Sequence, residues 1–122
     1  MAWQFKSGIS LSTQIVNKLR LDILGGVYPP GCDFPTVREL AATASVNPNT
    51  MQKALAILEE EGLLLTKGTV GRSVTCDEEA LARARERVLE EFIRGVTRDA
   101  QLLNIEKDNF IELIEKGWQI DG

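Results

Sequence analysis

Two strong helix-start signals lie close together in this chain and constrain its fold more than any other feature. Thr36-Val37-Arg38-Glu39 has the pattern of a capping box, in which the Thr36 hydroxyl accepts a hydrogen bond from the Glu39 amide and the Glu39 carboxylate accepts one from the Thr36 amide. Asn47-Pro48 is a second start, because Asn is a strong N-cap and Pro suits the first helical position. The first of these helices must therefore end near Ser45-Val46, with a tight connection to the next.

Apolar spacing predicts the helices around this turn. An earlier helix, which Gly25-Gly26 should end, has its stripe at Leu11, Ile15, Val16, Leu19 and Ile23. The short helix after Thr36 has its apolar side at Val37, Leu40, Ala41 and Ala44. The helix opened by Asn47 closes at Gly62 and has its core side at Met51, Ala54, Leu55 and Leu58.

A β-hairpin is predicted directly after these helices. Residues 63–66 and 72–76 have strand character, and the loop between them, residues 67–71, contains Gly68 and Gly71. Residues 32–34 are expected to form a short strand. Two short helices in tight succession, followed by a hairpin, have the layout of a winged helix-turn-helix domain.

The last part of the sequence predicts two more helices, one from about Asp77 to Asn104 and one from about Phe110. They are too small to form a separate stable core, so their apolar stripes should be buried against a second copy or against the first domain. We expect a mainly α protein with a small β-hairpin, composed of a winged helix-turn-helix at residues 1–76 and a two-helix dimerisation tail at residues 77–122. The expected dimerisation residues are Leu81, Val88, Leu89, Phe92, Ile93, Val96, Leu103, Phe110, Leu113, Ile114 and Trp118.

Composition excludes several classes of function. The 122 residues contain no histidine, and no nucleophile stands beside a base, so neither an enzyme nor a metal or other cofactor is expected. Cys32 and Cys76 lie far apart in the sequence and are expected to be reduced, as in the cytoplasm. No segment has the pattern of a signal peptide or a membrane span. The net charge of −4 argues against a general basic coat, but residues 1–76 are almost neutral and the acidic excess lies in residues 77–122.

Side chains suited to DNA gather at the start of the helix opened by Asn47. Asn49, Gln52 and Lys53 lie opposite its core side, with Asn47 and Thr50 at the tip, and such groups bond to base edges or phosphate oxygens. The acids Glu59, Glu60 and Glu61 follow roughly 15 Å further along this helix at about 1.5 Å per residue. That separation exceeds the Debye length of about 8 Å at physiological salt, so the helix can enter a groove tip first.

Four segments resemble the DNA-binding domain of the GntR transcriptional regulators: residues 26–31 (GVYPPG), 34–41 (FPTVRELA), 46–55 (VNPNTMQKAL) and 58–64 (LEEEGLL). Trp3-Gln4-Phe5 and the short helical tail are similar to the YtrA-type subfamily. The resemblance implies a homodimeric repressor of a palindromic operator, often beside transporter genes. It also implies that residues 67–72 form the wing, although this wing has less arginine than that of many relatives. The expected DNA-binding residues are Thr36, Arg38, Asn47, Pro48, Asn49, Thr50, Gln52, Lys53, Lys67, Gly68, Gly71 and Arg72.

Simpler interpretations stand beside these. Arg38 can merely pair with Glu39 or Glu59, and charges at a hairpin tip also keep a sheet edge soluble. The main alternative function is a protein-binding winged-helix adaptor that does not bind DNA. The sequence leaves open whether a small-molecule effector binds between the paired tails, although two helices enclose little volume.

Overall fold

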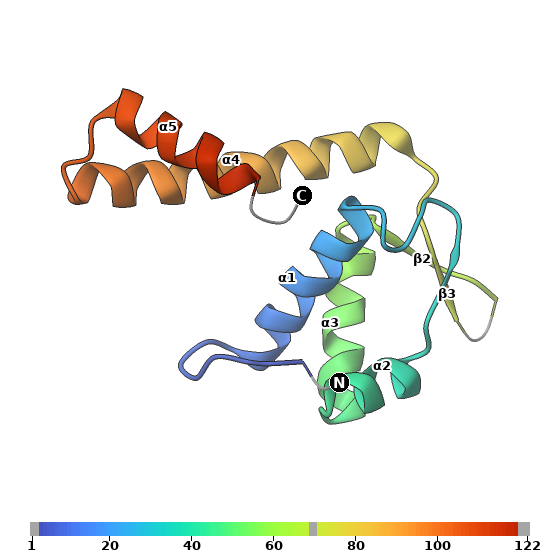
Figure 1. Cartoon of the computed structure of the whole chain (residues 1–122). Helices are drawn as coiled ribbons and strands as arrows, with labels where there is room; N and C mark the ends of the chain where they lie inside the picture. The colour runs from blue at the N-terminus through green and yellow to red at the C-terminus, as the bar shows by residue number, and fades with distance from the viewer. Residues whose placement is uncertain (1–2, 69–70, 120–122) are drawn as a thin grey trace. The chain divides into compact units, whose positions relative to one another are not determined.

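The computed structural model describes residues 3–68 and 71–119 (Figure 1). Thr69 and Val70 of the predicted hairpin loop lie outside the described residues. In chain order, the elements are α1 (Leu11–Leu24), β1 (Asp33–Phe34), α2 (Val37–Ala44), α3 (Pro48–Glu60), β2 (Leu64–Thr66), β3 (Arg72–Val74), α4 (Glu78–Leu102) and α5 (Lys107–Trp118). The chain divides into two compact units, Met1–Ala84 and Arg85–Gly122, so that the division falls within α4.

Both predicted helix starts are confirmed, with one difference. Asn47 is the N-cap of α3, and its side-chain oxygen accepts a hydrogen bond of 2.8 Å from the Asn49 amide. Thr36 caps α2 and accepts from the Glu39 amide at 3.1 Å. The Glu39 carboxylate accepts from the Thr36 hydroxyl at 3.2 Å, whereas the sequence predicted the Thr36 amide as its donor. Ser45 ends α2 with a φ of 58°, and this left-handed residue makes the tight connection to α3.

The predicted hairpin is part of a larger sheet. β3 lies between β1 and β2 and pairs with both in antiparallel orientation, with Phe34 and Thr66 opposite Arg72. The sequence predicted the strand of residues 32–34 but not its place beside β3. β3 ends at Val74, before the expected Cys76, because the chain turns towards α4 there. The Thr75 hydroxyl accepts from the Asp77 amide at 3.1 Å, and the Asp77 carboxylate accepts from the Ala80 amide at 3.1 Å.

The first unit contains a complete hydrophobic core. α1 packs against α3, and α3 also packs against α2 and β2 (Figure 1). The side chains that fill the centre have an exposed fraction of 0%: Ile15, Leu19, Met51, Ala54, Leu55 and Leu58. Leu81 and Ala84, in the first turns of α4, are also buried in this unit, at 5% and 4%. Leu81 therefore has little surface left for the contact with a second copy that the sequence analysis expected.

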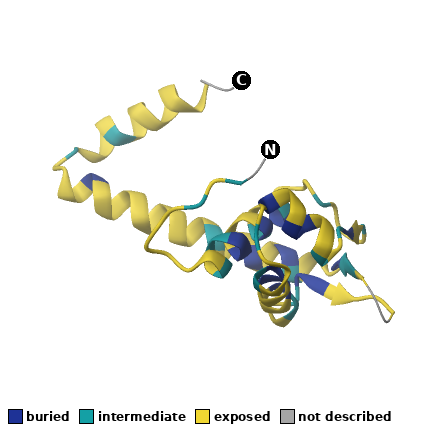
Figure 2. Cartoon of the chain, turned by 90° about the horizontal axis from the view of Figure 1, so that it is seen from below, coloured by how far each residue is buried: buried dark blue, intermediate teal, exposed yellow. Residues whose placement is uncertain are grey.

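The second unit is a helical hairpin formed by the rest of α4 and by α5. Asn104 has a φ of 57°, which confirms the predicted left-handed turn at the end of the long helix. α5 begins at Lys107, so Ile105 and Phe110 hold the two positions of the predicted hydrophobic staple. Ala100 is the single buried residue among the described residues 85–119, and Figure 2 shows almost the whole hairpin as exposed. None of the helices in the described residues combines the length and apolar character that a membrane span requires.

Candidate nucleic-acid interface

The first turns of α3 present polar side chains to solvent. Asn47, Pro48, Asn49, Gln52 and Lys53 are exposed, and Thr50 is half-buried. The opposite side of the helix is fixed in the core by Met51 and Leu55, so this orientation follows from the apolar spacing. The side-chain oxygen of Asn47 is already used by the cap. The amides of Asn49 and Gln52 and the amine of Lys53 are therefore the groups best placed to reach a ligand in front of the helix tip.

Arg38 extends this polar surface from the first turn of α2. It is exposed, and none of the ion pairs among residues 3–68 and 71–119 includes Arg38 or Lys53. Glu59 pairs with Arg72, and Glu39 accepts from the Thr36 hydroxyl, so neither of the pairings considered for Arg38 is found among the described residues. The charges of Arg38 and Lys53 both remain available for an external anion.

A surface hollow of about 340 Å³ lies where the start of α2, the side of α3 and the loop end of the β2–β3 hairpin meet. It brings together residues that are far apart in the sequence: Thr36, Arg38, Gln52, Gly71 and Arg72 were expected at the DNA interface, and Pro35, Val37 and Thr66 complete the lining. The other expected residues do not line it: Asn47, Pro48, Asn49, Thr50 and Lys53 belong to the start of α3, and Lys67 and Gly68 follow β2. The expected residues therefore fall into three groups, the hollow, the tip of α3 and the start of the hairpin loop.

The β2–β3 hairpin includes residues 67–72, which were expected to form the wing, and we use the name wing for the whole hairpin. Its two expected cations, Lys67 and Arg72, both form ion pairs within the chain. The Lys67 amine pairs with the Asp33 carboxylate of β1 at 2.6 Å, and both side chains are largely exposed. Arg72 pairs through Nε with the Glu59 carboxylate of α3, and their side chains are only 14% and 28% exposed. Gly68 and Gly71 have φ values of 63° and 99°, a backbone conformation that suits glycine.

The acidic end of α3 is largely neutralised within the chain. Besides Arg72, Glu59 accepts a hydrogen bond of 2.8 Å from the Thr66 hydroxyl, and these two hydrogen bonds hold the pKa of the Glu59 carboxyl below its ordinary value. Glu61 binds Arg20 of α1 through two hydrogen bonds of 2.9 and 2.5 Å. The sequence places these acids far from the tip and offers Arg38 as a partner for Glu59, whereas the structure pairs Glu59 with Arg72. One feature of the sequence could have indicated that Glu59 belongs to the interface. It follows Gln52 by two helical turns and so lies on the same side of α3.

The second unit offers an apolar surface of a different kind. Apolar side chains with large exposed fractions include Leu89, Phe92 and Ile93 at 54–55% and Leu103 at 72%. Val96, Leu113, Ile114 and Trp118 are also exposed, while Val88 and Phe110 are half-buried. A hollow of about 540 Å³ between α4 and α5 is lined mainly by such residues, among them Ile93, Val96, Ile111 and Ile114.

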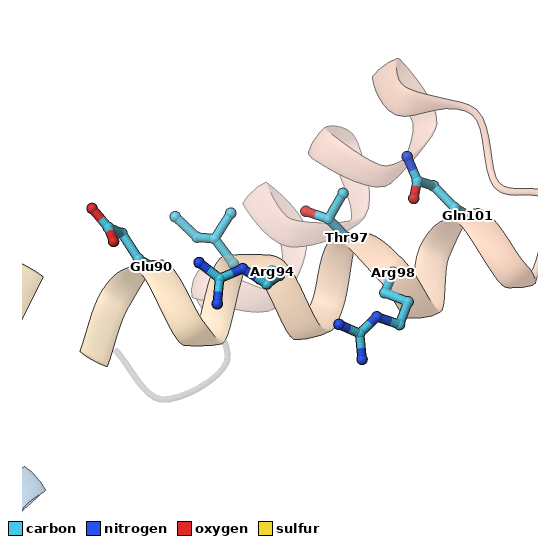
Figure 3. Close-up of a pocket in the computed structure, with 6 residues that line it drawn as sticks. Glu90, Arg94, Thr97, Arg98 and Gln101 are labelled. Atoms are coloured by element: carbon cyan, nitrogen blue, oxygen red, sulfur yellow. The ribbon is translucent and has the colours of Figure 1, made fainter. Parts of the chain in front are cut away.

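A second hollow of this unit, of about 490 Å³, has a polar character. Figure 3 shows Glu90, Arg94, Thr97, Arg98 and Gln101 projecting from α4, and Ile93 completes the lining. Since these residues all belong to one helix, the hollow is an open surface along α4. We assign it no binding role.

Comparisons with known proteins agree with the fold. The pattern of the family described as bacterial regulatory proteins, gntR family, matches residues 11–74. The chain is 31% identical to the HTH-type transcriptional repressor YtrA of Bacillus subtilis over 91% of this chain and 86% of that protein. It is 26% identical to the HTH-type transcriptional regulator YhcF of the same species over 92% and 93% of the two chains. A solved GntR family transcriptional regulator from Listeria monocytogenes superimposes with a TM-score of 0.84 and 28% identity, over 92% of this chain and 98% of that one. The chain therefore belongs to the GntR family of transcriptional regulators, which bind DNA through a helix-turn-helix domain.

Proposed function

We propose that this protein is a homodimeric transcriptional repressor that binds a palindromic operator. The observation that carries the proposal is the exposed polar tip of α3, where Asn49, Gln52 and Lys53 stand on a helix whose other side is fixed in the core. A helix presented in this way fits the major groove of B-DNA, where amides can pair with base edges. Asn49 and Gln52 are assigned to bases, and Arg38 and Lys53 to phosphates.

The other expected interface residues have supporting positions in this proposal. Asn47 and Pro48 set the start of α3, Thr36 sets the start of α2, and Thr50 stands at the tip beside Asn49. Lys67 and the glycines Gly68 and Gly71 approach the DNA backbone from the wing. Lys67 would then exchange its exposed Asp33 partner for a phosphate, which costs little because exposed ion pairs contribute only about 0–1 kcal/mol.

The proposed dimer contact is formed by the second unit. A monomer that exposes Phe92 and Leu103 to this extent leaves a large apolar area in water, and full burial of such a side chain is worth about 1.5–3 kcal/mol, of which more than half remains to be gained here. A second copy supplies the same surface with the same chemistry, as two-fold symmetric interfaces do. The contact would comprise Val88, Leu89, Phe92, Ile93, Val96, Leu103, Phe110, Leu113, Ile114 and Trp118.

Repression is proposed to be steric, since a dimer on an operator that overlaps a promoter blocks polymerase there. The relative YtrA is described as a repressor, which supports this direction of control. The resemblance to its subfamily also supports transporter genes as targets and a cytoplasmic site of action, where operator DNA is found. The proposal needs no cofactor and assigns no effector.

Selection from a random duplex pool tests this function. The expected result is a two-fold symmetric site with half-sites about one helical turn apart, and an affinity that falls steeply as salt rises. The protein-binding adaptor predicts no enriched duplex and almost no salt-dependent binding, and that outcome would overturn the proposal.

A further inference from the structure

Glu59 lies at a junction of three elements. Its two carboxylate oxygens accept from two different strands of the wing: Oε1 from Arg72 of β3 and Oε2 from the Thr66 hydroxyl of β2, the latter at 2.8 Å. Thr66 and Arg72 are opposite each other in the β2–β3 register. One side chain at the end of α3 thus connects that helix to both strands of the wing, at the strand pair next to its loop.

The Arg72–Glu59 pair is more protected from solvent than the Lys67–Asp33 pair, which holds the other cation of the wing. The side chains of Arg72 and Glu59 are 14% and 28% exposed, against 64% and 75% for Lys67 and Asp33. A pair shielded in this way is screened less by salt and is costly to break, because its remaining partner keeps an unpaired charge. Arg72 is therefore less free than Lys67 to leave its carboxylate for a phosphate.

The position of this pair connects it to the proposed DNA-reading side chains. Glu59 follows Gln52 by two helical turns, about 10 Å along the axis, on the same side of α3. Arg72, Thr66 and Gln52 all line the hollow that also contains Arg38. The contacts of Glu59 hence determine where the wing stands relative to the side chains assigned to bases and phosphates.

We propose that Glu59 is a positioning residue for DNA binding, which fixes the wing to α3 through Arg72 and Thr66, and that Arg72 acts as a strut rather than as a phosphate contact. This inference rests on the proposed DNA-binding function and changes the role expected for Arg72 from the sequence. It predicts that loss of the pair weakens binding by displacing the wing and leaves the number of neutralised phosphates unchanged.

The test measures operator affinity against salt concentration for the full-length protein and its variants. Glu59→Gln and Arg72→Ala are each expected to lower affinity about tenfold, as broken positioning contacts do, with the wild-type slope of log affinity against log salt. Arg38→Ala serves as the phosphate-contact reference, with a slope smaller by about 1. Glu60→Gln is the matched control for charge removal at the end of α3, because Glu60 is exposed and belongs to none of the ion pairs of the described residues. It is expected to retain wild-type affinity.

The double variant Glu59→Arg with Arg72→Glu keeps an ion pair at the same place with its charges exchanged. If the role of the Arg72–Glu59 pair is structural, this double variant should recover most of the operator affinity that either single variant loses. Urea unfolding of each protein shows whether it is folded at the assay temperature, and Thr66→Val provides a milder perturbation of the same junction if one of the charge variants is not.

Three results would overturn the inference: unchanged or higher affinity in Glu59→Gln, a slope smaller by about 1 in Arg72→Ala, or no recovery in the exchanged pair. A wild-type protein that fails to bind any selected duplex would instead overturn the proposed function itself, so the two failures are distinguishable.

Discussion

The two units of this chain bury their apolar residues to very different extents. In the first unit, Ile15, Leu19, Met51, Leu55 and Leu58 have no exposed surface. In the second unit, Phe92, Ile93 and Leu103 are more than half exposed, although they follow an equally regular helical spacing. The difference indicates that the first unit can be stable within one protomer, while the helical hairpin needs a further surface to cover it.

This contrast separates the two tasks proposed for the chain. The unit with a closed core can hold α2 and α3 rigidly, so their exposed polar side chains keep a fixed arrangement. The unit with an open apolar face can join two protomers and set the distance between their α3 helices. Loss of a DNA-facing side chain in the first unit should therefore leave the dimer intact, whereas loss of the dimer should lower operator affinity, because one protomer offers only one α3 to the operator.

The largest expected effect is on the stability of the first unit. Leu58→Ala removes a fully buried side chain and leaves a cavity among α1, α3 and β2, so the free energy of unfolding should fall by about 2–5 kcal/mol. Phe92→Ala, at a 55% exposed position, should change the stability of the first unit by less than about 1 kcal/mol. Urea titrations that follow a probe in the first unit measure the free energy of unfolding of both variants. Equal losses of stability in Leu58→Ala and Phe92→Ala would contradict the difference between the two units.

Charge on the apolar face of the second unit should break the dimer. Phe92→Asp places a carboxylate where the proposed contact buries an aromatic ring, which we expect to weaken association by at least about 2 kcal/mol. Light scattering should then report the mass of one protomer. Glu91→Asp is a control at the neighbouring exposed position. A dimer in Phe92→Asp would locate the contact elsewhere.

Removal of an unpaired cation should affect DNA binding alone. Arg38→Ala and Lys53→Ala are each expected to weaken operator binding by about 1–3 kcal/mol, because a contact to the nucleic acid is lost, while the dimer stays intact. Mobility-shift titration measures the first effect and light scattering the second. Wild-type affinity in either variant would remove that residue from the interface.

The smallest effect concerns the stability of the first unit at low pH. Because its hydrogen bonds lower the pKa of Glu59 from 4.5, the Arg72–Glu59 pair stabilises the fold above that pH and loses its contribution as the pH falls through the lowered value. The stability difference between the wild type and Glu59→Gln should therefore be full at neutral pH and vanish in strong acid. Urea titrations across this range check the trend, and a difference that grows on acidification would contradict it.

Local signals in the sequence were sufficient for the helices and for the polar tip. Asn47-Pro48 and the spacing of Met51 and Leu55 determine both where α3 begins and which side faces solvent, since capping and apolar periodicity act over a few residues. The glycines and Ser45 likewise act within single turns.

Contacts between distant residues could not be predicted in the same way. The place of β1 beside β3, the burial of Leu81 in the first unit and the pairing of Arg72 with Glu59 all depend on how the elements pack together. For this reason, the pattern of charges along the sequence did not predict which charged residues pair with each other. Arg72 was expected to face DNA or solvent from the wing, and Glu59 to lie away from the DNA or to pair with Arg38, whereas the fold brings Arg72 and Glu59 together.

The stoichiometry of the complex with a selected operator tests the central claim most directly. Sedimentation of the full-length protein with a duplex that contains one symmetric site should show two protomers on each duplex, and this stoichiometry should be lost together with affinity in Phe92→Asp. One protomer on each duplex at saturation, or no complex at all, would contradict the account.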